Sequence, residues 1–386
     1  MSEKEAKSSW MERFGMRYFA YRSRKIAPVE VSDEIHVLNA QERKALLRVQ
    51  HNTIFRQSLA GAISAGISVL IGFMLWPRPG DWDAELPWEE QIEYYAWLYG
   101  LSFFVTAIEI AYLYYDSLKS VHKLSTVAGL DLFPVQGERQ GVTVSLVRAA
   151  LELPNPPDDL DGVNPRREIS KIRVFISTMI YKLKATATNF VVKAVMRRVA
   201  GRSALRAAME FVAVPVFAFW NGLIAYWVIR QARIRAMGPS AVVEFGKVIF
   251  PGALNYSEKA HAVAFQAIGS AIVRTVDLHP NLISFMEVTE SYLGSPGEVV
   301  LDDSSLYLDS LAQLRPEEQE FALKVLVLAS ILDGKLALRE KKLLRQALET
   351  TGFQPSLQGI EDLKDSFVKG REIHPEELEN CLPPRI

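Results

Sequence analysis

The sequence predicts an all-α protein with a two-helix transmembrane hairpin, a central amphipathic helical domain and a small helical domain at its C-terminal end. Three observations lead to this prediction. Residues 58–76 hold no charge and residues 95–115 hold only Glu109, and each stretch has the length of about 20 residues that crosses a bilayer as a helix. Apolar residues recur three and four apart through 166–206. An Asp-Gly corner divides two helical patterns in "LASILDGKLALREKKLL", residues 328–344.

The composition bounds the class of protein. The chain has 386 residues, 49% hydrophobic and 23% charged, with a formal net charge of −1. This balance gives no electrostatic reason to expect nucleic acid as a partner. The single cysteine, Cys381, excludes an intramolecular disulfide.

Charge and periodicity divide the chain into five segments. We expect a basic N-terminal region at 1–56 and the transmembrane hairpin at 57–123. A short helix and a proline- and aspartate-rich linker follow at 124–165. A central basic helical domain at 166–300 and a last helical domain at 301–386 complete the chain.

The flanks of the hairpin predict its orientation. Basic residues lie outside the two apolar stretches, whereas the loop between them is acidic. The basic residues are Arg43, Lys44, Arg48, Arg56, Lys119 and Lys123, and the loop holds Asp81, Asp83, Glu85, Glu89, Glu90 and Glu93 against Arg78. The positive-inside rule then places both ends of the hairpin in the cytoplasm. We therefore expect a bacterial inner-membrane protein with cytoplasmic N- and C-termini.

Two features inside the hairpin are candidate functional elements. Small residues recur three or four apart in the first stretch, at Gly61, Ala65, Ser68 and Gly72. Such a stripe lets helices approach closely, either within the hairpin or between copies in a homo-oligomer. Glu109 is a carboxyl group in an apolar segment, where it needs a partner or a proton. We expect a hydrogen bond to a serine of the first stretch, such as Ser64 or Ser68, with an ion path as the alternative.

The central domain predicts contact with lipid. Residues 211–229 are free of charge, but basic residues flank both sides and Pro215 lies inside. We expect a helix buried in a protein core or lying partly in the inner leaflet, with a third span as the alternative. The preceding helical pattern is basic and amphipathic, which favours contact with anionic lipids. The residues expected to make this contact are Lys171, Arg173, Lys182, Lys184, Arg197 and Arg198.

The Asp-Gly corner resembles a known family. Asp333 is not the first ligand of an EF-hand, because Lys335, Ala337, Leu338 and Leu344 stand where that loop needs oxygen ligands and a glycine. The pattern of Asp333, Gly334, Leu336 and Glu340 after an apolar helix is similar to the tellurite-resistance TerB-like domain, over about residues 305–375. The resemblance implies a small all-helical fold, a divalent cation at Asp333 and Glu340, and membrane-associated stress complexes. Ala337 and the nearby Lys335 depart from the family pattern, so we expect these carboxyl groups to lock the turn rather than bind metal.

No sequence motif indicates a reaction. The chain lacks the P-loop, dinucleotide, zinc-protease and hydrolase motifs. We expect a non-enzymatic scaffold or stress sensor, without a cofactor, that recruits protein partners through residues 301–386. A channel or transporter component that uses Glu109 is the alternative, and an enzyme acting on lipid is a weaker one.

Overall fold

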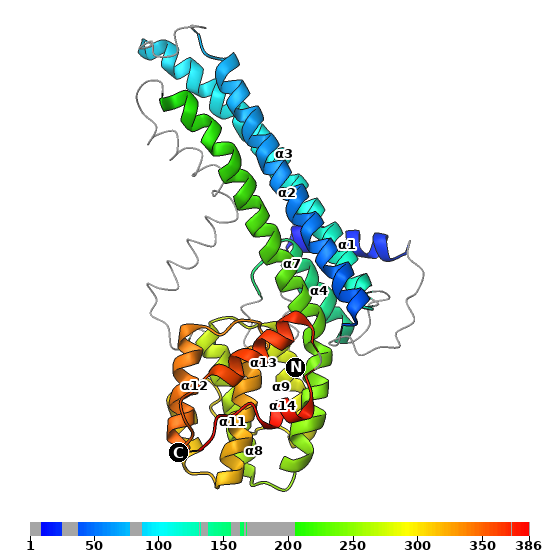
Figure 1. Ribbon diagram of the computed structural model, residues 1–386, viewed down its shortest axis with the longest axis vertical. Helices are drawn as coiled ribbons and strands as arrows, with labels where there is room; N and C mark the ends of the chain where they lie inside the picture. Colours follow the sequence, from blue (N-terminus) through cyan, green and yellow to red (C-terminus); the bar gives the residue numbers. More distant parts are fainter. Residues whose placement is uncertain are drawn as a thin grey trace.

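The computed structural model describes residues 9–24, 38–77, 87–130, 132, 138–155, 163–165, 167, 205–371 and 373–385. Over these residues the chain forms helices and no strand, which confirms the predicted all-α class. A single isolated bridge pairs Phe353 with Arg385. The helices form a long stalk at one end and a rounded body at the other (Figure 1).

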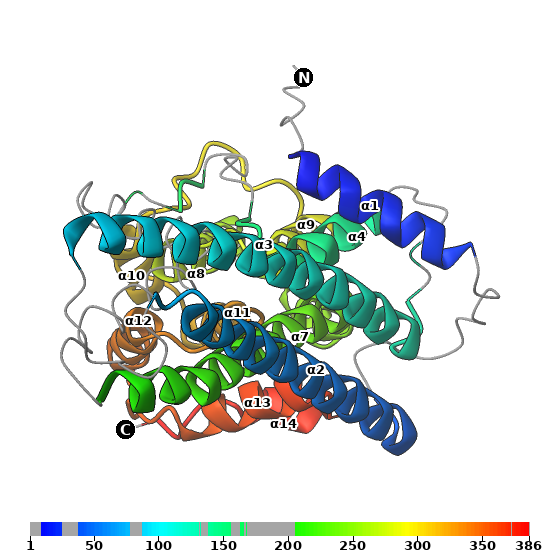
Figure 2. The same ribbon diagram turned by 90° about the horizontal axis from the view of Figure 1, so that it is seen from above.

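Three long helices make the stalk: α2 (Ala40–Met74), α3 (Trp88–Val127) and the first half of α7 (Leu205–Ala253). They run side by side in both ribbon views (Figures 1 and 2). The stretches 58–76 and 95–115 lie almost wholly within α2 and α3, which extend well beyond them. Asn39 caps the start of α2. Its side-chain oxygen accepts hydrogen bonds from the backbone N–H groups of Gln41 and Glu42, and the Glu42 carboxylate accepts one from the backbone N–H of Asn39.

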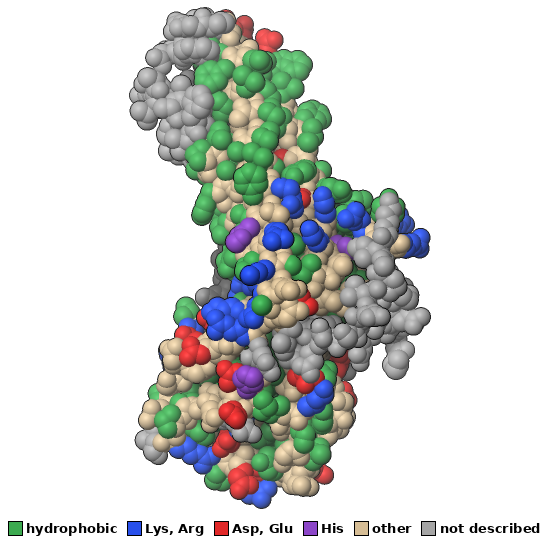
Figure 3. All heavy atoms as spheres, turned by 45° about the vertical axis from the view of Figure 1, so that its right-hand side comes forward, with side chains coloured by type: hydrophobic (Ala, Val, Ile, Leu, Met, Phe, Trp, Pro, Cys, Tyr) green, Lys and Arg blue, Asp and Glu red, His purple; other side chains and the backbone are tan. Residues whose placement is uncertain are grey.

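Most of the surface of the stalk is apolar. In the most apolar 18 residues of α2 and of α3, only 33% and 22% are buried. The core helix of a soluble protein is mostly buried, so these two helices do not fit that description. Both are long and apolar enough to cross a membrane. Figure 3 shows hydrophobic side chains covering the upper stalk and Lys and Arg side chains gathered below them.

The body packs around α8 and α11. Pro316 and the acids Glu317 and Glu318 begin α11, as expected at the positive end of a helix, and Ser257 caps α8. The body consists of the second half of α7 with α8 (Glu258–Thr275), α9 (Pro280–Leu293), α10 (Ser304–Ala312), α11 (Pro316–Ile331), α12 (Leu338–Thr350), α13 (Gln358–Lys369) and α14 (Pro375–Glu379). At the junction with the stalk lie α1 (Trp10–Ser23) and α4 (Glu138–Ala150).

The domain boundary expected at 300 falls inside one core. Gln266 of α8 donates a hydrogen bond to the carbonyl of Val300 at 3.1 Å. A Cβ atom on Gly269 would lie 2.2 Å from the carbonyl oxygen of Leu301. Buried residues of α7, α8, α10, α11 and α12 belong to the same hydrophobic cluster. Residues 301–386 therefore do not form a domain separate from α8 and α9.

The segment 211–229 belongs to the stalk. Residues 205–253 form one continuous helix, despite prolines at 215, 239 and 251. The side of α7 that carries Phe217 and Asn221 is buried against α2, whereas Phe219 and Trp227 are exposed. The sequence predicts a helix buried in a protein core or lying partly in the inner leaflet, with a third span as the alternative. In the structure the segment packs along α2 and α3 rather than inside the body, and the third span stays a prediction. The segment is the third helix beside the hairpin.

Candidate functional site

Glu109 lies at the point where the three stalk helices meet. Its carboxylate accepts a hydrogen bond from the Ser64 hydroxyl of α2 at 2.5 Å and another from the Asn221 side-chain amide of α7 at 2.7 Å. All three side chains are buried. The predicted bond to a serine of the first stretch is present, and Ser64 rather than Ser68 makes it. Both carboxyl oxygens hold a neighbouring helix, so the group locks three helices together.

Asn221 was not predicted as the second partner of Glu109. The two residues are 112 positions apart in sequence, and nothing in the local pattern pairs them. The only signal was a polar amide inside an otherwise apolar stretch. Such a residue needs a partner when it is buried.

The small-residue stripe is covered by helices of the same chain. Gly61, Ala65, Ser68 and Gly72 are all buried. A Cβ atom on Gly61 would lie 2.7 Å from the carbonyl oxygen of Phe217 in α7. At the other end of the stripe, Tyr94 of α3 donates to the carbonyl of Gly72 at 3.2 Å. The stripe thus serves packing within the stalk and is not open to a second copy.

A layer of polar pairs joins α2 to α3 just beyond their apolar stretches, on the side toward the body. Arg56 of α2 pairs with Asp116 of α3 at 2.8 Å. The Thr53 hydroxyl donates to Ser120, and the Gln57 amide donates to Ser117. These contacts follow directly on the apolar stretches. Figure 3 shows the apolar surface of the upper stalk giving way to Lys and Arg side chains toward the body.

The Asp-Gly corner joins the stalk helix to the body. Gly334 has φ of +73°, and a Cβ atom there would lie 2.3 Å from the Ile234 Cδ1 of α7. The Arg230 guanidinium of α7 donates to the Gly334 carbonyl at 2.5 Å. From α9, the Asn281 amide donates to the carbonyls of Ile234 and Leu332 at 3.1 and 2.7 Å. The side chains of Arg230 and Asn281 therefore connect α7 and α9 to the backbone of the Asp-Gly corner.

Asp333 and Glu340 lock this turn from inside. The Asp333 carboxylate accepts from the Lys335 backbone N–H at 2.7 Å, and Glu340 accepts from that of Ala337 at 2.8 Å. Both side chains are buried. Burial raises the pKa of both carboxyl groups, and the charge of Asp333 raises the pKa of Glu340 further. The pair favours retention of a proton at neutral pH.

The fit of this pair to a divalent cation is poor. Glu340 Oε1 is the one carboxyl oxygen of the pair that is buried without a hydrogen-bond partner. Within the described part of the chain, no group of three or more His, Cys, Asp or Glu residues comes together as a metal site would require. The positive charges of Lys335 and Arg230 act on Asp333.

The residues predicted to contact lipid lie outside the described residues. These are Lys171, Arg173, Lys182, Lys184, Arg197 and Arg198.

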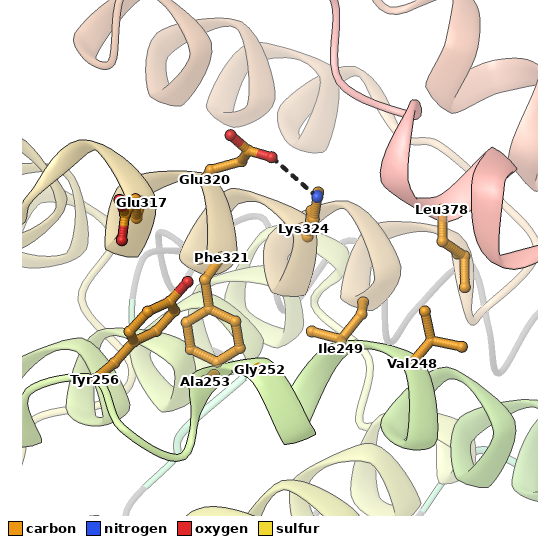
Figure 4. Close-up of a pocket in the computed structure, with 10 residues that line it drawn as sticks. All are labelled: Val248, Ile249, Gly252, Ala253, Tyr256, Glu317, Glu320, Phe321, Lys324 and Leu378. Carbon is orange, nitrogen blue, oxygen red and sulfur yellow. Dashed lines mark ion pairs between the residues drawn. The ribbon is translucent and has the colours of Figure 1, made fainter.

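The body also carries a cavity of about 230 Å³ between α7, α11 and α14. Figure 4 shows its floor of Ile249 and Phe321, with Leu378 at one side. On its rim Lys324 pairs with Glu320 at 3.0 Å, and Glu317 lies close by. An apolar floor with a charged rim suits an apolar side chain of a protein partner.

Comparison of the chain with protein-family models, with curated proteins and with solved structures finds no match. The likeness to the TerB-like domain therefore stays a prediction from residues Asp333, Gly334, Leu336 and Glu340.

Proposed function

We propose that the protein is a membrane-tethered, non-enzymatic scaffold that recruits partners at the cytoplasmic face of a bacterial inner membrane. One observation carries the proposal. The stalk exposes apolar side chains along α2 and α3, whereas the body buries its apolar residues in a shared core. The surface of the stalk suits lipid and that of the body suits water. The family resemblance adds the proposal that the recruited complex acts in envelope or chemical stress.

The direction of insertion follows from the charges. The start of α2 and the end of α3 both lie at the end of the stalk that carries the body (Figure 1). Arg43, Lys44, Arg48, Lys119 and Lys123 are exposed there. Glu89 and Glu93 are exposed at the far end. The positive-inside rule supports a cytoplasmic body and an external tip.

Labelling of single cysteines tests this topology. The native Cys381 is a poor reporter, because it is buried and burial raises the pKa of its thiol to about 12. We therefore place the reporters in a Cys381→Ala background, at exposed positions. Glu89→Cys reports the tip and Lys342→Cys reports the body. A membrane-impermeant maleimide on intact spheroplasts is expected to label position 89 at once and position 342 only after lysis.

The opposite labelling pattern would reverse the orientation. Equal labelling of both positions in intact spheroplasts, with the protein in the membrane fraction, would show that the stalk does not span. Recovery of the protein in the soluble fraction would overturn the membrane tether itself.

Recruitment is tested at the cavity. A photo-crosslinking amino acid in place of Glu317, on the rim, is expected to trap a protein partner in living cells. The matched control replaces Asp362, which is exposed on α13. Adducts at position 317 alone would support a partner in the cavity. Their absence, or equal adducts at both positions, would count against it.

The buried carboxyl group of Glu109 keeps a channel or transporter component as the second candidate. Its two hydrogen bonds favour a locking role. Glu109→Gln retains a side chain that can bond to Ser64 and removes the titratable group. Proton or ion flux in liposomes that the wild type shows and this variant loses would favour the channel over the scaffold. Among the described residues, we find no observation that favours the lipid-acting enzyme.

A further inference from the structure

Helix α1 has an exposed face of unusual composition. Its buried side carries Glu12, Gly15 and Phe19. Its exposed side repeats at intervals of three, four or seven residues, as one stripe of a helix does. That stripe is Trp10, Arg13, Phe14, Arg17, Tyr21 and the cap residue Arg24. The three aromatic side chains are 72%, 52% and 56% exposed. Aromatic and guanidinium groups therefore alternate on this face, and no acid lies on it.

The contacts of α1 fix its level on the molecule. Tyr18 packs edge-on against Tyr115 of α3, with ring centroids 5.8 Å apart. Phe19 packs against His122, whose Nε2 is 3.0 Å from the Ser23 hydroxyl. Tyr115 is the last residue of the apolar stretch 95–115, and His122 lies about two turns beyond it on α3. Helix α1 thus lies at the level where the apolar surface of the stalk gives way to the basic one.

The orientation of α1 also fits a surface helix. It lies across the stalk axis in Figure 1 and is seen along its full length from above in Figure 2, where it overlies α4. Its buried face rests on α4, because a Cβ atom on Gly15 would lie 2.5 Å from the Val147 Cγ1. The face opposite α4 is the aromatic and basic one.

The exposed charges of α1 and of the neighbouring ends of α2 and α3 are positive. Arg13, Arg17 and Arg24 join the exposed bases of α2 and α3 at the same end of the stalk. The acids within 9–24, 38–56 and 116–127 are each bound by a neighbouring group. Glu12 pairs with Arg148, Asp116 pairs with Arg56, and Glu42 caps α2. The surface therefore complements a negatively charged plane.

From these observations we infer that α1 lies in the headgroup region of an anionic bilayer, with Trp10, Phe14 and Tyr21 inserted and the three arginines on lipid phosphates. This inference rests on the proposed insertion of the stalk. Aromatic side chains favour the membrane interface, and guanidinium groups pair with phosphate. This headgroup contact is made by α1, a segment that the sequence marks only as part of a basic N-terminal region.

Spin labels on the full-length protein in vesicles test the depth of α1. The vesicles hold phosphatidylcholine and phosphatidylglycerol in equal parts, and all labels are placed in the Cys381→Ala background. Phe14→Cys reports α1, Phe104→Cys reports the exposed stalk and Lys342→Cys reports the body. Collisions with oxygen, which partitions into lipid, are compared with those of a water-soluble nickel complex. We expect positions 14 and 104 to favour oxygen and position 342 to favour nickel.

Three outcomes would overturn the inference in distinguishable ways. Position 14 favouring nickel while position 104 favours oxygen would remove the inference and leave the membrane tether intact. Positions 14 and 104 both favouring nickel would overturn the tether as well. Spin–spin broadening at position 14 that disappears on dilution with unlabelled protein would show that a second copy, not lipid, covers α1.

The charges are tested separately. Each basic residue near an anionic surface contributes roughly a five-fold factor to binding. The triple variant Arg13→Gln, Arg17→Gln and Arg24→Gln is therefore expected to lower the partition constant of α1 between bilayer and water by about 100-fold. Vesicles of phosphatidylcholine alone are expected to lower the partition constant of the wild-type α1 as well. Lys342→Gln with Arg345→Gln is the matched control in the body. No difference between the two sets would overturn the electrostatic part of the inference.

Discussion

Gly334 combines a left-handed backbone with a close contact. Its φ is +73°, and a Cβ atom would lie 2.3 Å from Ile234 Cδ1. We expect Gly334→Ala to lower the free energy of unfolding by about 2–4 kcal/mol, from the backbone and the crowding together. Gly352→Ala is the matched control, because its φ is +76° with no atom within 4 Å. Denaturation of the full-length protein in detergent measures both. Equal losses would show that the contact with α7 contributes nothing.

Glu340 makes the stability of the body depend on pH. Its pKa in the folded protein is raised above the ordinary 4.5, so the folded state holds a proton that the unfolded state releases. The free energy of unfolding is therefore expected to fall as pH rises above about 4.5. Glu340→Gln keeps an acceptor for the Ala337 N–H and carries no charge, so it should flatten this decline.

Chemical denaturation from about pH 5 to about pH 8 measures the slope. Glu361→Gln serves as the control, because the Lys341 ammonium group lowers the pKa of Glu361 and its effect has the opposite sign. A decline that persists unchanged in Glu340→Gln would contradict the assignment to Glu340.

The packing of α2 on α7 depends on small residues at particular points. A Cβ atom on Gly61 would lie 2.7 Å from the Phe217 backbone, whereas Gly66 in the same helix has no atom within 4 Å. We expect Gly61→Ala to destabilise the stalk by about 1–3 kcal/mol, through overpacking. Gly66→Ala should be neutral or stabilising, since alanine favours a helix. Thermal unfolding in detergent distinguishes the two, and equal effects would refute the close approach of α7.

Helices with a strong local pattern were predictable and the contacts between distant helices were not. The two apolar stretches, the cap at Ser257, the first turn of α11 and the Asp-Gly corner all follow from local residue types. The packing of α7 on the hairpin depends on contacts such as that of Asn221 in α7 with Glu109 in α3, and no local sequence period indicates this pairing. The stripe on α1 was present in the sequence at helical spacing. The sequence alone does not reveal it, because the segment mixes acids and bases and only the structure shows that Glu12 is turned inward.

The whole molecule is held together by α7, which runs without a break from the stalk into the body. We expect a narrow distribution of distances between spin labels at Phe104→Cys in the stalk and Lys342→Cys in the body. Asn281→Ala removes the amide that holds Ile234 and Leu332 together and should broaden the distribution, because buried carbonyl groups lose their partner. Asn52→Ala, exposed on α2, is the control. An unchanged distribution in Asn281→Ala would show that the corner is not the joint.

The continuity of α7 also fixes how the body is rotated relative to the stalk about the axis of this helix. Asn221 faces Glu109 in the stalk, and Arg230 faces Gly334 in the body. Nine residues separate them (230 − 221 = 9), which at about 100° per residue is two and a half turns. The two attachments thus lie on opposite sides of one helix. A single residue inserted between them would turn the body by about 100° about the axis of α7, so that the stalk and the corner could not both remain docked. The length of this short segment therefore specifies how the body is rotated about the stalk.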